Sequence, residues 1–528
     1  MRVLISDKFA KKGLEVLQQA AGLQIDYRPG VKGDELIQAL ADAEALIIRS
    51  ETKVTAEVLA QAPRLKAVGR AGVGVDNVDL PAASRRGIVV MNTPGGNNVA
   101  AGEHTLALMM ALMRKIPQAH SALKAGRWEK SKFMGSELFR KTLGVIGFGN
   151  VGRIVVRGAL GLGMRVLVHD PFVVAEKIAG AGAVPAGLDE LLAQADLITL
   201  HVPQGEKTAK LINAGTIAKM KDGVRIINCA RGGLIEDADL VEALKSGKVA
   251  GAALDVFAAE PLTTSPYFEL ENVIVTPHLG ASTSEAQENV AIAIAEQIID
   301  FLQNGVIKNA VNAPAVEPEM LERMSAVLEL TERAGRLIGQ LLDEAPRTIK
   351  LFIGGDFAVL PDQPIIAAAL AGLLKQLPGE ATINYINAPY LAQERGIEVT
   401  ETRRQRLTDF TNVVGIKAVT TGGGYDCQVS LPAPHEPRIV RLNGYPITLA
   451  PRGILLVLTN RDVPGVVGDV GTLLGRAGIN IGELRLGRNK GDDHALMVIS
   501  IDSRAPDEVL RALGDLPAVQ SAKQVFLN

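Results

Sequence analysis

The chain has 528 residues, too many for one hydrophobic core, and this length predicts roughly three or four domains. A formal net charge of −2 gives no electrostatic argument for nucleic acid or an acidic membrane surface as a main partner. Two cysteines argue against a disulfide framework, and the sequence shows neither a signal-peptide pattern nor an apolar run of membrane-spanning length, so we expect a cytoplasmic protein without membrane contact.

The first part of the chain, to about residue 95, alternates short apolar strands with helical patterns. This alternation predicts an α/β layer, and the layer has no glycine-rich nucleotide motif of its own. A long helix follows, which the side chain of Asn97 or Asn98 could cap. The expected strands are Val3 to Ser6, Ala45 to Arg49, Leu65 to Gly69 and Ile88 to Met91.

A glycine-rich motif, GFGNVG at residues 147–152, comes next. An apolar strand, Thr142 to Ile146, precedes it, an apolar-periodic helix, Val151 to Leu162, follows it, and a second strand then reaches the carboxylate of Asp170. Strand, helix and acid at these positions predict a dinucleotide-binding βαβ unit. Asp170 would accept hydrogen bonds from the adenosine ribose hydroxyls and would repel a 2′-phosphate, which favours NAD over NADP.

Each position of the motif has a physical role. Gly147 allows the tight turn, Gly149 lets a pyrophosphate approach the backbone, and Gly152 lets the helix pack closely on the strand. Asn150 and Val151 are expected to donate backbone N–H groups to the diphosphate at the start of the helix. The alternative is a glycine-rich turn in another kind of α/β protein.

The later strands of this unit are largely apolar, which suits burial on both faces of a parallel sheet. A long helix from Ser284 to Gln303 has no strand after it, so we expect it to return and pack on the first layer. Two chain crossings, near residues 97 and 282, would then form a hinge above a cleft. The later strands are expected at Leu197 to Leu200, Val224 to Asn228, Ala250 to Leu254 and Val273 to Thr276.

Three polar segments follow predicted strand ends, where ligands bind in open α/β sheets. Their chemically useful side chains are Arg231, Glu260 and His278. A guanidinium can hold a carboxylate by two hydrogen bonds, and a histidine beside a carboxylate can take a hydroxyl proton as a hydride leaves for nicotinamide. This set suits reversible oxidation of a 2-hydroxy acid, with Arg231 as the clamp, His278 as the acid–base and Glu260 as its orienting carboxylate.

Seven segments resemble motifs of the D-isomer-specific 2-hydroxyacid dehydrogenases, in that family's order, over residues 1 to about 312. The resemblance implies an α/β fold in which a Rossmann-like NAD domain at 98–281 is inserted in a flavodoxin-like substrate domain at 1–97 and 282–312. It also implies that Arg231, Glu260 and His278 are catalytic. The segments are Arg49, GRAGVGVDN at 69–77, NTPG at 92–95, GFGNVG at 147–152, NCARGG at 228–233, ALDVFAAEP at 253–261 and TPHLGAST at 276–283.

The same resemblance implies which residues line the NAD site. Cys229 could instead be a reactive thiol, but a small residue beside the nicotinamide is the favoured interpretation. Val73 stands where some relatives carry threonine, so any hydroxyl contact from that position is lost. No metal is expected, and His104, in an apolar helix, is expected to be a packed, hydrogen-bonded residue. The implied NAD residues are Gly147, Gly149, Asn150, Val151, Gly152, Asp170, Cys229, Ala230, Asp255 and Gly280.

A phosphate-bearing substrate needs cations besides Arg231. Arg49 and Arg70, each at the end of a first-layer strand, are expected to face the cleft. The resemblance implies that these two arginines and Asn97 contact the substrate. The segment Gly126 to Phe133 of a neighbouring subunit could add a further cation.

The C-terminal half is expected to form two more domains. Residues 315–450 resemble the intervening α+β domain of long forms of the family, and residues 452–528 resemble a βαββαβ ACT domain. Such domains pair between subunits and hold amino acids at the seam, so Asn460, Asp462 and Asn480 are expected to bind L-serine. The alternative is a dimerisation module without a ligand. We expect a homotetramer assembled through the ACT and NAD domains.

The resemblance to the long forms implies the NAD-dependent oxidation of D-3-phosphoglycerate to 3-phosphohydroxypyruvate, the first step of the phosphorylated route to L-serine, with serine as regulator. A glyoxylate or hydroxypyruvate reductase, or another D-2-hydroxyacid dehydrogenase, is the main alternative. It leaves roughly 200 C-terminal residues without a role. A more distant alternative is an NAD(H)-sensing binding protein of the same fold.

Overall fold

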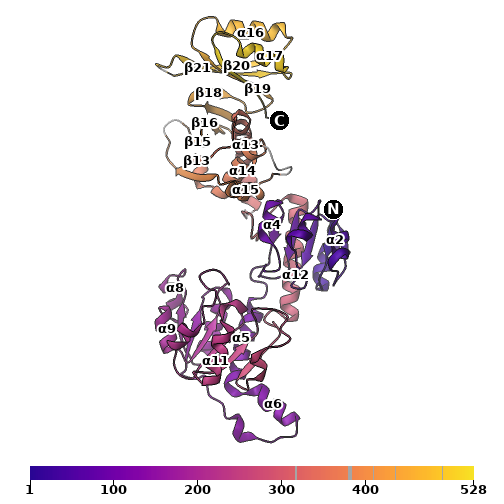
Figure 1. The fold of residues 1–528 in the computed structure, drawn as a ribbon, viewed down its shortest axis with the longest axis vertical. Coiled ribbons are helices and arrows are strands. Elements are labelled where there is room, and N and C mark those ends of the chain that lie inside the picture. Colours follow the sequence, from indigo (N-terminus) through magenta and orange to yellow (C-terminus); the bar gives the residue numbers. More distant parts are fainter. Residues whose placement is uncertain (315–317, 378–382, 408–409, 434–435, 490, 528) are drawn as a thin grey trace.

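The computed structural model describes residues 1–314, 318–377, 383–407, 410–433, 436–489 and 491–527. Within these ranges the strands form four sheets, which lie one after another along the long axis of the molecule (Figure 1). The sheet at the C-terminus lies at one end, and the sheet that carries the glycine-rich motif lies toward the other. In the described ranges, no helix has both the length and the apolar character of a membrane span.

The first sheet is parallel, with the strand order β2-β1-β3-β4-β5. The sequence prediction missed β2. Its four residues, Gln24 to Tyr27, alternate between polar and apolar side chains and are half-exposed or exposed, so they give only a weak apolar signal. The strands are β1 (Arg2–Ile5), β2 (Gln24–Tyr27), β3 (Ala45–Ile48), β4 (Ala67–Arg70) and β5 (Val89–Met91). The helices between them are α1 (Lys11–Gln19), α2 (Gly33–Leu40), α3 (Ala56–Ala60) and α4 (Leu80–Arg85).

The long helix α12 (Ser284–Asn304) packs on this first sheet, although the second sheet precedes it in the sequence. Its apolar stripe, which includes Ile294 and Ile298, is buried against Val3 and Ile5 of β1. The chain therefore crosses between the two sheets twice, once where α5 (Asn98–Arg114) begins and once where α12 begins. Both crossings lie beside the cleft between the sheets.

The second sheet is also parallel, with the order β12-β11-β10-β9-β6-β7-β8. Four of its central strands are wholly or almost wholly buried, as the apolar runs predict. The sequence prediction missed β8, a two-residue exposed edge strand. The strands are β6 (Thr142–Ile146), β7 (Arg165–His169), β8 (Val184–Pro185), β9 (Leu197–Leu200), β10 (Val224–Asn228), β11 (Val249–Leu254) and β12 (Val273–Val275).

Seven α-helices accompany the second sheet within the described residues. The expected side-chain cap of α5 is wrong, because Asn97 occupies the N-cap position but its side chain accepts no cap hydrogen bond. Asn97 lines the cavity between the first two sheets. The helices are α5, α6 (Ile116–Lys124), α7 (Asn150–Gly161), α8 (Ala175–Gly180), α9 (Leu188–Gln194), α10 (Ala214–Ala218) and α11 (Asp237–Ser246).

The third sheet is mixed, with the order β14-β13-β15-β16-β17-β18, and only its β13 and β14 pair is parallel. Two helices on it approach each other closely, since a Cβ atom at Gly335 would lie 2.2 Å from the carbonyl oxygen of Ala369. The strands are β13 (Thr348–Gly355), β14 (Glu398–Arg404), β15 (Asn412–Val419), β16 (Gly424–Ser430), β17 (Arg438–Leu442) and β18 (Tyr445–Leu449). The α-helices are α13 (Pro318–Leu341), α14 (Asp362–Leu374) and α15 (Asn387–Glu394).

The fourth sheet is antiparallel, with the order β20-β21-β19-β22. One face packs on α16 (Val466–Arg476) and α17 (Asp507–Gly514). The other face joins the core of the third sheet, where Leu455 and Val457 share a cluster with Leu337. The strands are β19 (Ile454–Arg461), β20 (Ile481–Arg488), β21 (His494–Ile501) and β22 (Val519–Phe526).

Candidate active site

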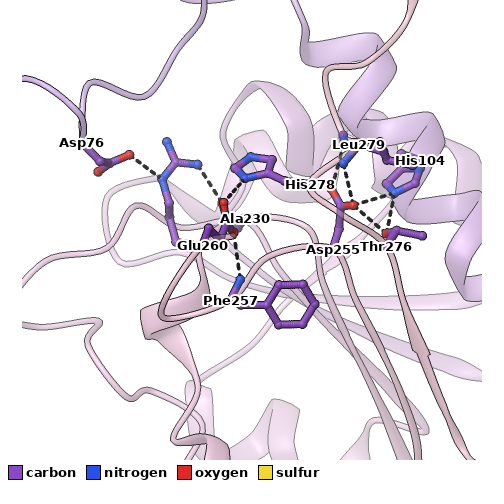
Figure 2. Close-up of polar contacts among 11 residues, drawn as sticks. Asp76, His104, Ala230, Asp255, Phe257, Glu260, Thr276, His278 and Leu279 are labelled. Carbon is purple, nitrogen blue, oxygen red and sulfur yellow. Dashed lines mark hydrogen bonds and ion pairs between the residues drawn. The ribbon is translucent and has the colours of Figure 1, made fainter. Parts of the chain in front are cut away.

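His278 and Glu260 form the centre of the cleft between the first two sheets. His278 Nδ1 lies 2.7 Å from Glu260 Oε2 (Figure 2). This hydrogen bond raises the pKa of His278, while burial works against the rise. Burial alone would raise the pKa of Glu260, but the hydrogen bonds from His278 and from the Phe257 N–H lower it overall. The pair therefore favours a negative carboxylate that stabilises a protonated imidazole.

The backbone of His278 is held in an uncommon conformation. Its φ of +54° lies in the left-handed region, which costs a histidine on the order of 1 kcal/mol and persists only where surrounding contacts fix it. The N–H of His278 donates to the carbonyls of Asp255 and Thr276. The loop after strand β12 is thereby fixed with the imidazole turned toward Glu260.

Asp255 holds the same loop through hydrogen bonds to its backbone. Its side chain is fully buried, and its two oxygens accept from Leu279 N–H at 2.7 Å and Gly280 N–H at 2.8 Å. Thr276 Oγ1 and His104 Nε2 reach the same carboxylate, at 2.6 Å and 3.2 Å (Figure 2). Burial opposes ionisation, but these donors hold the pKa of Asp255 below its ordinary value. All of these donors to the Asp255 carboxylate belong to the protein. His104 is hydrogen-bonded, as its place in an apolar helix predicts.

Arg231 projects from the loop after β10 toward the first sheet. Its Nε lies 3.2 Å from Asp76 Oδ2, and its Nη1 donates to the Ala230 carbonyl at 2.7 Å. Gly74 makes room for it, because a Cβ atom there would lie 2.1 Å from Arg231 Nη2. The Arg231 guanidinium, which comes from the second sheet, therefore packs on the loop of the first sheet that contains Gly74 and Asp76.

A cavity of about 880 Å³ opens beside these groups, and both sheets contribute to its wall. Arg70 is largely buried there; burial and the charges of Arg231 and Arg49 lower its pKa to about 10, and its Nε has no hydrogen-bond partner in the described chain. Three guanidinium groups close together are electrostatically unfavourable unless an anion binds between them. Residues of the wall include Arg49, Arg70, Asn97, Glu260, His278 and Ser282.

The glycine motif has the geometry of a phosphate-binding turn. Gly147 has a φ of +100°, and a Cβ atom on it would lie 2.4 Å from the His201 carbonyl oxygen. A Cβ atom on Gly152 would lie 2.2 Å from the Gly147 carbonyl oxygen, whereas one on Gly149 would meet nothing within 4 Å. The turn is therefore closed against the sheet and open above Gly149, where α7 presents the N–H groups of Asn150 and Val151.

Asp170 lies at the tip of β7, beside this turn. Its Oδ2 accepts from the Phe148 N–H at 2.8 Å and its Oδ1 from the Phe172 N–H at 2.9 Å. Each carboxylate oxygen has a second lone pair, so the side chain can hold the glycine turn and still accept from ribose hydroxyls.

The remaining predicted nucleotide residues follow β10. Burial raises the pKa of the Cys229 thiol to about 12, so the side chain stays a neutral thiol, as the interpretation of a small wall residue requires. Ala230, next to it, donates its N–H to Asn228 Oδ1 at 3.0 Å. Burial also lowers the pKa of His201 to about 4, which keeps that imidazole neutral.

The residues expected to bind serine do not meet within one chain. Asn460 is the last residue but one of β19, is 2% exposed, and has an Oδ1 with no partner in the described chain. Asp462 lies beside it and pairs with Arg488 at 3.0 Å. Asn480 precedes β20 at the opposite end of the sheet, where its amide donates to Asp502. A site that uses all three residues requires a second chain.

Some residues around the cleft were not predicted from the sequence. Asp7, Asn77 and Asp76 hold or pair with the arginines, and Lys8, Lys32 and Lys53 add positive charge to the cavity wall. Asp7 could have been found, because it follows a strand at the same sheet edge as Arg49 and Arg70. Asp76 and Asn77 lie inside a glycine-rich loop, where sequence gives no direction for a side chain.

Comparisons with known proteins match three successive parts of the chain. The D-isomer specific 2-hydroxyacid dehydrogenase NAD binding domain matches residues 106–280, the D-3-phosphoglycerate dehydrogenase intervening domain matches residues 323–443, and the ACT domain matches residues 454–518. D-3-phosphoglycerate dehydrogenase of Synechocystis is 43% identical over 100% of this chain and 95% of its own length. The Archaeoglobus fulgidus protein of the same name is 40% identical, with both chains covered in full.

Two solved structures align with more than half of this chain. D-lactate dehydrogenase from Aquifex aeolicus, complexed with NAD and lactic acid, aligns with a TM-score of 0.52 and 32% identity over 59% of this chain and 100% of its own. A glyoxylate reductase from Paecilomyes thermophila aligns with a TM-score of 0.54 and 28% identity over 59% of this chain and 98% of its own.

Proposed function

The chain belongs to the D-3-phosphoglycerate dehydrogenases, and we propose that Arg231, Glu260 and His278 oxidise D-3-phosphoglycerate to 3-phosphohydroxypyruvate with NAD. The single observation that carries the assignment of roles is the 2.7 Å contact between His278 and Glu260 inside a cavity walled by arginines. That cavity offers an acid–base group and several anion-binding groups to one small molecule. The reaction is the first step of the phosphorylated route to L-serine.

His278 moves the proton. Its Nδ1–H donates to Glu260, so in the neutral imidazole the lone pair lies on Nε2. Nε2 accepts the proton of the substrate's 2-hydroxyl, and Glu260 stabilises the imidazolium that results. Bound NAD supplies the acceptor for the hydride that leaves the same carbon. In the reverse direction the imidazolium returns the proton to the oxygen of the 2-oxo acid.

The arginines hold the two anionic ends of the substrate. Arg231 is near enough to His278 to influence its pKa, so it suits the carboxylate beside the reacting carbon. Arg70 and Arg49, on the first sheet, suit the phosphate. Asn97, whose amide is not spent on a helix cap, can donate to the substrate where the two sheets meet.

NAD fits the second sheet at the glycine motif and Asp170. The open space above Gly149 receives the diphosphate, and the Asp170 carboxylate accepts from the ribose and disfavours a 2′-phosphate. Cys229, Ala230, Asp255 and Gly280 lie on the loops that end at the nicotinamide side. We propose domain boundaries at 98–281 for this NAD domain, 1–97 with 282–312 for the substrate domain, 315–450 for the intervening domain and 452–528 for the ACT domain.

The direct test is NAD reduction by the purified protein with D-3-phosphoglycerate, glycolate and D-glycerate as separate substrates. We expect a clear preference for the phosphorylated acid and for NAD over NADP. A preference for glycolate, or reduction of glyoxylate in place of 3-phosphohydroxypyruvate, would favour the reductase alternative. Binding of NAD(H) without turnover of any of these acids would favour the sensor alternative.

Regulation by L-serine rests on the fourth sheet. The unpartnered Oδ1 of Asn460 is a buried acceptor that an ammonium or hydroxyl donor would satisfy, and Asp462 supplies charge beside it. Because Asn480 lies at the far end of the sheet, two chains would have to form the site together. Isothermal titration of L-serine into the intact protein tests this, and absence of binding would favour the ligand-free dimerisation module.

Exposed apolar side chains suit a subunit contact near α6. Apolar side chains stand exposed on and after α6, with Trp128 82% and Met134 79% exposed, and a subunit contact there would bury them. Together with paired fourth sheets this gives a homotetramer, which sedimentation equilibrium can test. The cytoplasm is the expected location, and neither nucleic acid nor membrane is an expected partner.

A further inference from the structure

The loop of residues 49–52, which carries Arg49 at its start, is fixed from one side by Asp7. Asp7 is 2% exposed. Its Oδ2 accepts from the N–H groups of Arg49 at 2.6 Å, Thr52 at 3.2 Å and Glu51 at 3.3 Å. Its Oδ1 accepts from the Thr52 hydroxyl. One buried carboxylate thus satisfies three backbone N–H groups of the loop and one hydroxyl. A buried carboxylate is costly unless such partners stay in place.

Asn77 fixes the same loop from the other side. Its Nδ2 donates to the carbonyl of Arg49 at 2.8 Å and to the carbonyl of Thr52 at 2.7 Å. The Asn77 carbonyl in turn accepts from the Val54 N–H at 2.8 Å. Asp7 therefore holds the N–H groups of Arg49, Glu51 and Thr52, and Asn77 holds the carbonyls of Arg49 and Thr52. Asp7 follows β1, whereas Asn77 lies in the loop between β4 and α4.

The side chain of Arg49 is left without a partner by this arrangement. In the described ranges its guanidinium makes no hydrogen bond or ion pair, although its main chain is bonded on both sides. It lines the cavity that also contains His278. Lys8 and Lys53, which flank the same loop and line the same wall, likewise have no ion-pair partner in that part of the chain. The same wall also contains the carboxylate of Glu51, so the three cations outnumber it at this end of the cavity.

We propose that Asp7 and Asn77 are positioning residues that hold Arg49 toward the phosphate of the substrate and so set the preference for a phosphorylated acid. The inference rests on the proposed function. Neither residue contacts the substrate in this scheme, and both act through the orientation of Arg49. A misplaced guanidinium weakens phosphate binding while the proton transfer at His278 remains intact.

The test compares D-3-phosphoglycerate with D-glycerate, which lacks the phosphate. Wild type, Arg49→Ala, Asn77→Ala and the double variant are assayed with each acid at saturating NAD. We expect Asn77→Ala to raise KM for D-3-phosphoglycerate roughly ten- to a hundredfold, with kcat and the constants for D-glycerate little changed. In the double variant, KM for D-3-phosphoglycerate should be no higher than in Arg49→Ala alone, because both substitutions remove the same interaction between Arg49 and the phosphate.

Asn312→Ala is the matched control. Asn312 lies outside the strands, beside β5 of the same sheet, and makes three similar hydrogen bonds, to Val90 N–H and the Ile88 carbonyl at 2.8 Å and to Ser84 at 3.2 Å. Unlike Asn77, which bonds to Arg49, it has no partner that lines the cavity among these three. It should lower thermal stability without changing the preference between the two acids. Asp7→Asn, which keeps the shape of the side chain, gives a second variant if Asn77→Ala does not fold.

The outcomes separate the inference from the function on which it rests. If the wild type does not prefer D-3-phosphoglycerate, the proposed function itself fails. If Arg49→Ala removes the preference while folded Asn77→Ala and Asp7→Asn keep it, only the positioning role is overturned. Additive losses in the double variant would also overturn it, because Asn77 would then act by a route other than Arg49.

Discussion

In the cleft, Glu260 and His278 come from different loops yet lie 2.7 Å apart, whereas in the fourth sheet Asn460 and Asn480 lie at opposite ends of the strands. Both residues follow strands of the parallel second sheet, in which every strand ends at the same edge, so residues that follow strand ends converge. In the fourth sheet β19 and β20 run in the same direction, because both pair antiparallel with β21. The end of one and the start of the other are therefore far apart.

This difference separates two kinds of site in one chain. The parallel sheets assemble a cavity wall with arginines from the first sheet and the acid–base pair from the second. In the antiparallel sheet, the proposed serine site would be completed by symmetry, when a second copy brings its own Asn480 to the first copy's Asn460. Catalysis should thus be a property of each chain's own residues, and regulation a property of the pair.

The largest expected effect tests the cleft. His278→Ala removes the group that takes the hydroxyl proton, so kcat should fall by about 10² to 10⁴ while the Kd for NAD barely changes. Stopped-flow assays of NADH formation and titrations of NAD measure the two quantities. His494→Ala, on β21 and remote from the cleft, is the control and should keep wild-type kcat without serine. Wild-type turnover in His278→Ala across pH would exclude it as the acid–base.

The second prediction tests the symmetric site. Asn460→Ala and Asn480→Ala should each abolish serine inhibition, which corresponds to a coupling of about 1–3 kcal/mol, or roughly 5- to 150-fold. When the two variants are assembled together, each mixed pair regains one intact site, because one chain supplies Asn460 and the other supplies Asn480. Partial recovery of inhibition in mixed oligomers is therefore expected. Inhibition that survives in either single variant would place the serine site elsewhere.

Much of the fold could be predicted because local sequence and tertiary environment agree. The bounds of β6, β9 and β10 follow directly from apolar runs between polar segments. β2 and β8 are edge strands whose residues are half-exposed or exposed, so their formation depends on a neighbouring strand rather than on their own sequence. The cap expected from Asn97 is absent, and the residue lines the cleft at the start of the helix.

The candidate site could be predicted in part, because its main residues follow apolar strands that the sequence shows. Arg231, Glu260 and His278 follow strand ends, and strand ends can be located from sequence. The contacts of Asp7 and Asn77 could not be predicted, because hydrogen bonds between three loops depend on how the loops fold over one another. The sequence-based expectation placed Asn460, Asp462 and Asn480 at a seam between subunits but could not give their separation within one chain. That separation depends on strand order and direction, which put Asn460 and Asn480 at opposite ends of the sheet.

The third prediction concerns the cofactor half of the cleft. Asp170→Ala should weaken NAD binding roughly tenfold, because a charge-assisted acceptor for the ribose hydroxyls is lost. It should also lower the ratio of NAD to NADP preference roughly tenfold, because the charge that repels a 2′-phosphate is lost. The kcat/KM values for NAD and NADP, measured side by side, test it. Asp189→Ala, which breaks a surface ion pair with Lys219 in the same domain, is the control. An unchanged ratio of NAD to NADP would remove Asp170 from the ribose site.

The smallest effect is a shift in the pH profile, and its sign follows from the His278–Glu260 contact. The hydrogen bond to Glu260 raises the pKa of His278 above 6.5, while burial opposes the rise. Oxidation needs the neutral imidazole, so kcat/KM for D-3-phosphoglycerate should fall as pH drops through that raised pKa. Reduction needs the imidazolium and should fall as pH rises through it. Glu260→Gln removes the charge that favours the imidazolium, so both midpoints should move to lower pH.

A matched carboxylate shows whether that shift is local. Glu236 also pairs with a cation, Lys210 at 2.6 Å, but outside the cavity wall, so Glu236→Gln should leave the profile in place. An unchanged midpoint in Glu260→Gln would mean that another group controls the protonation step, and the cleft would then not be the self-contained site that the parallel strands assemble. A shift confined to Glu260→Gln would tie the proton transfer to two residues of one chain, in contrast to the proposed serine site, which would need two chains.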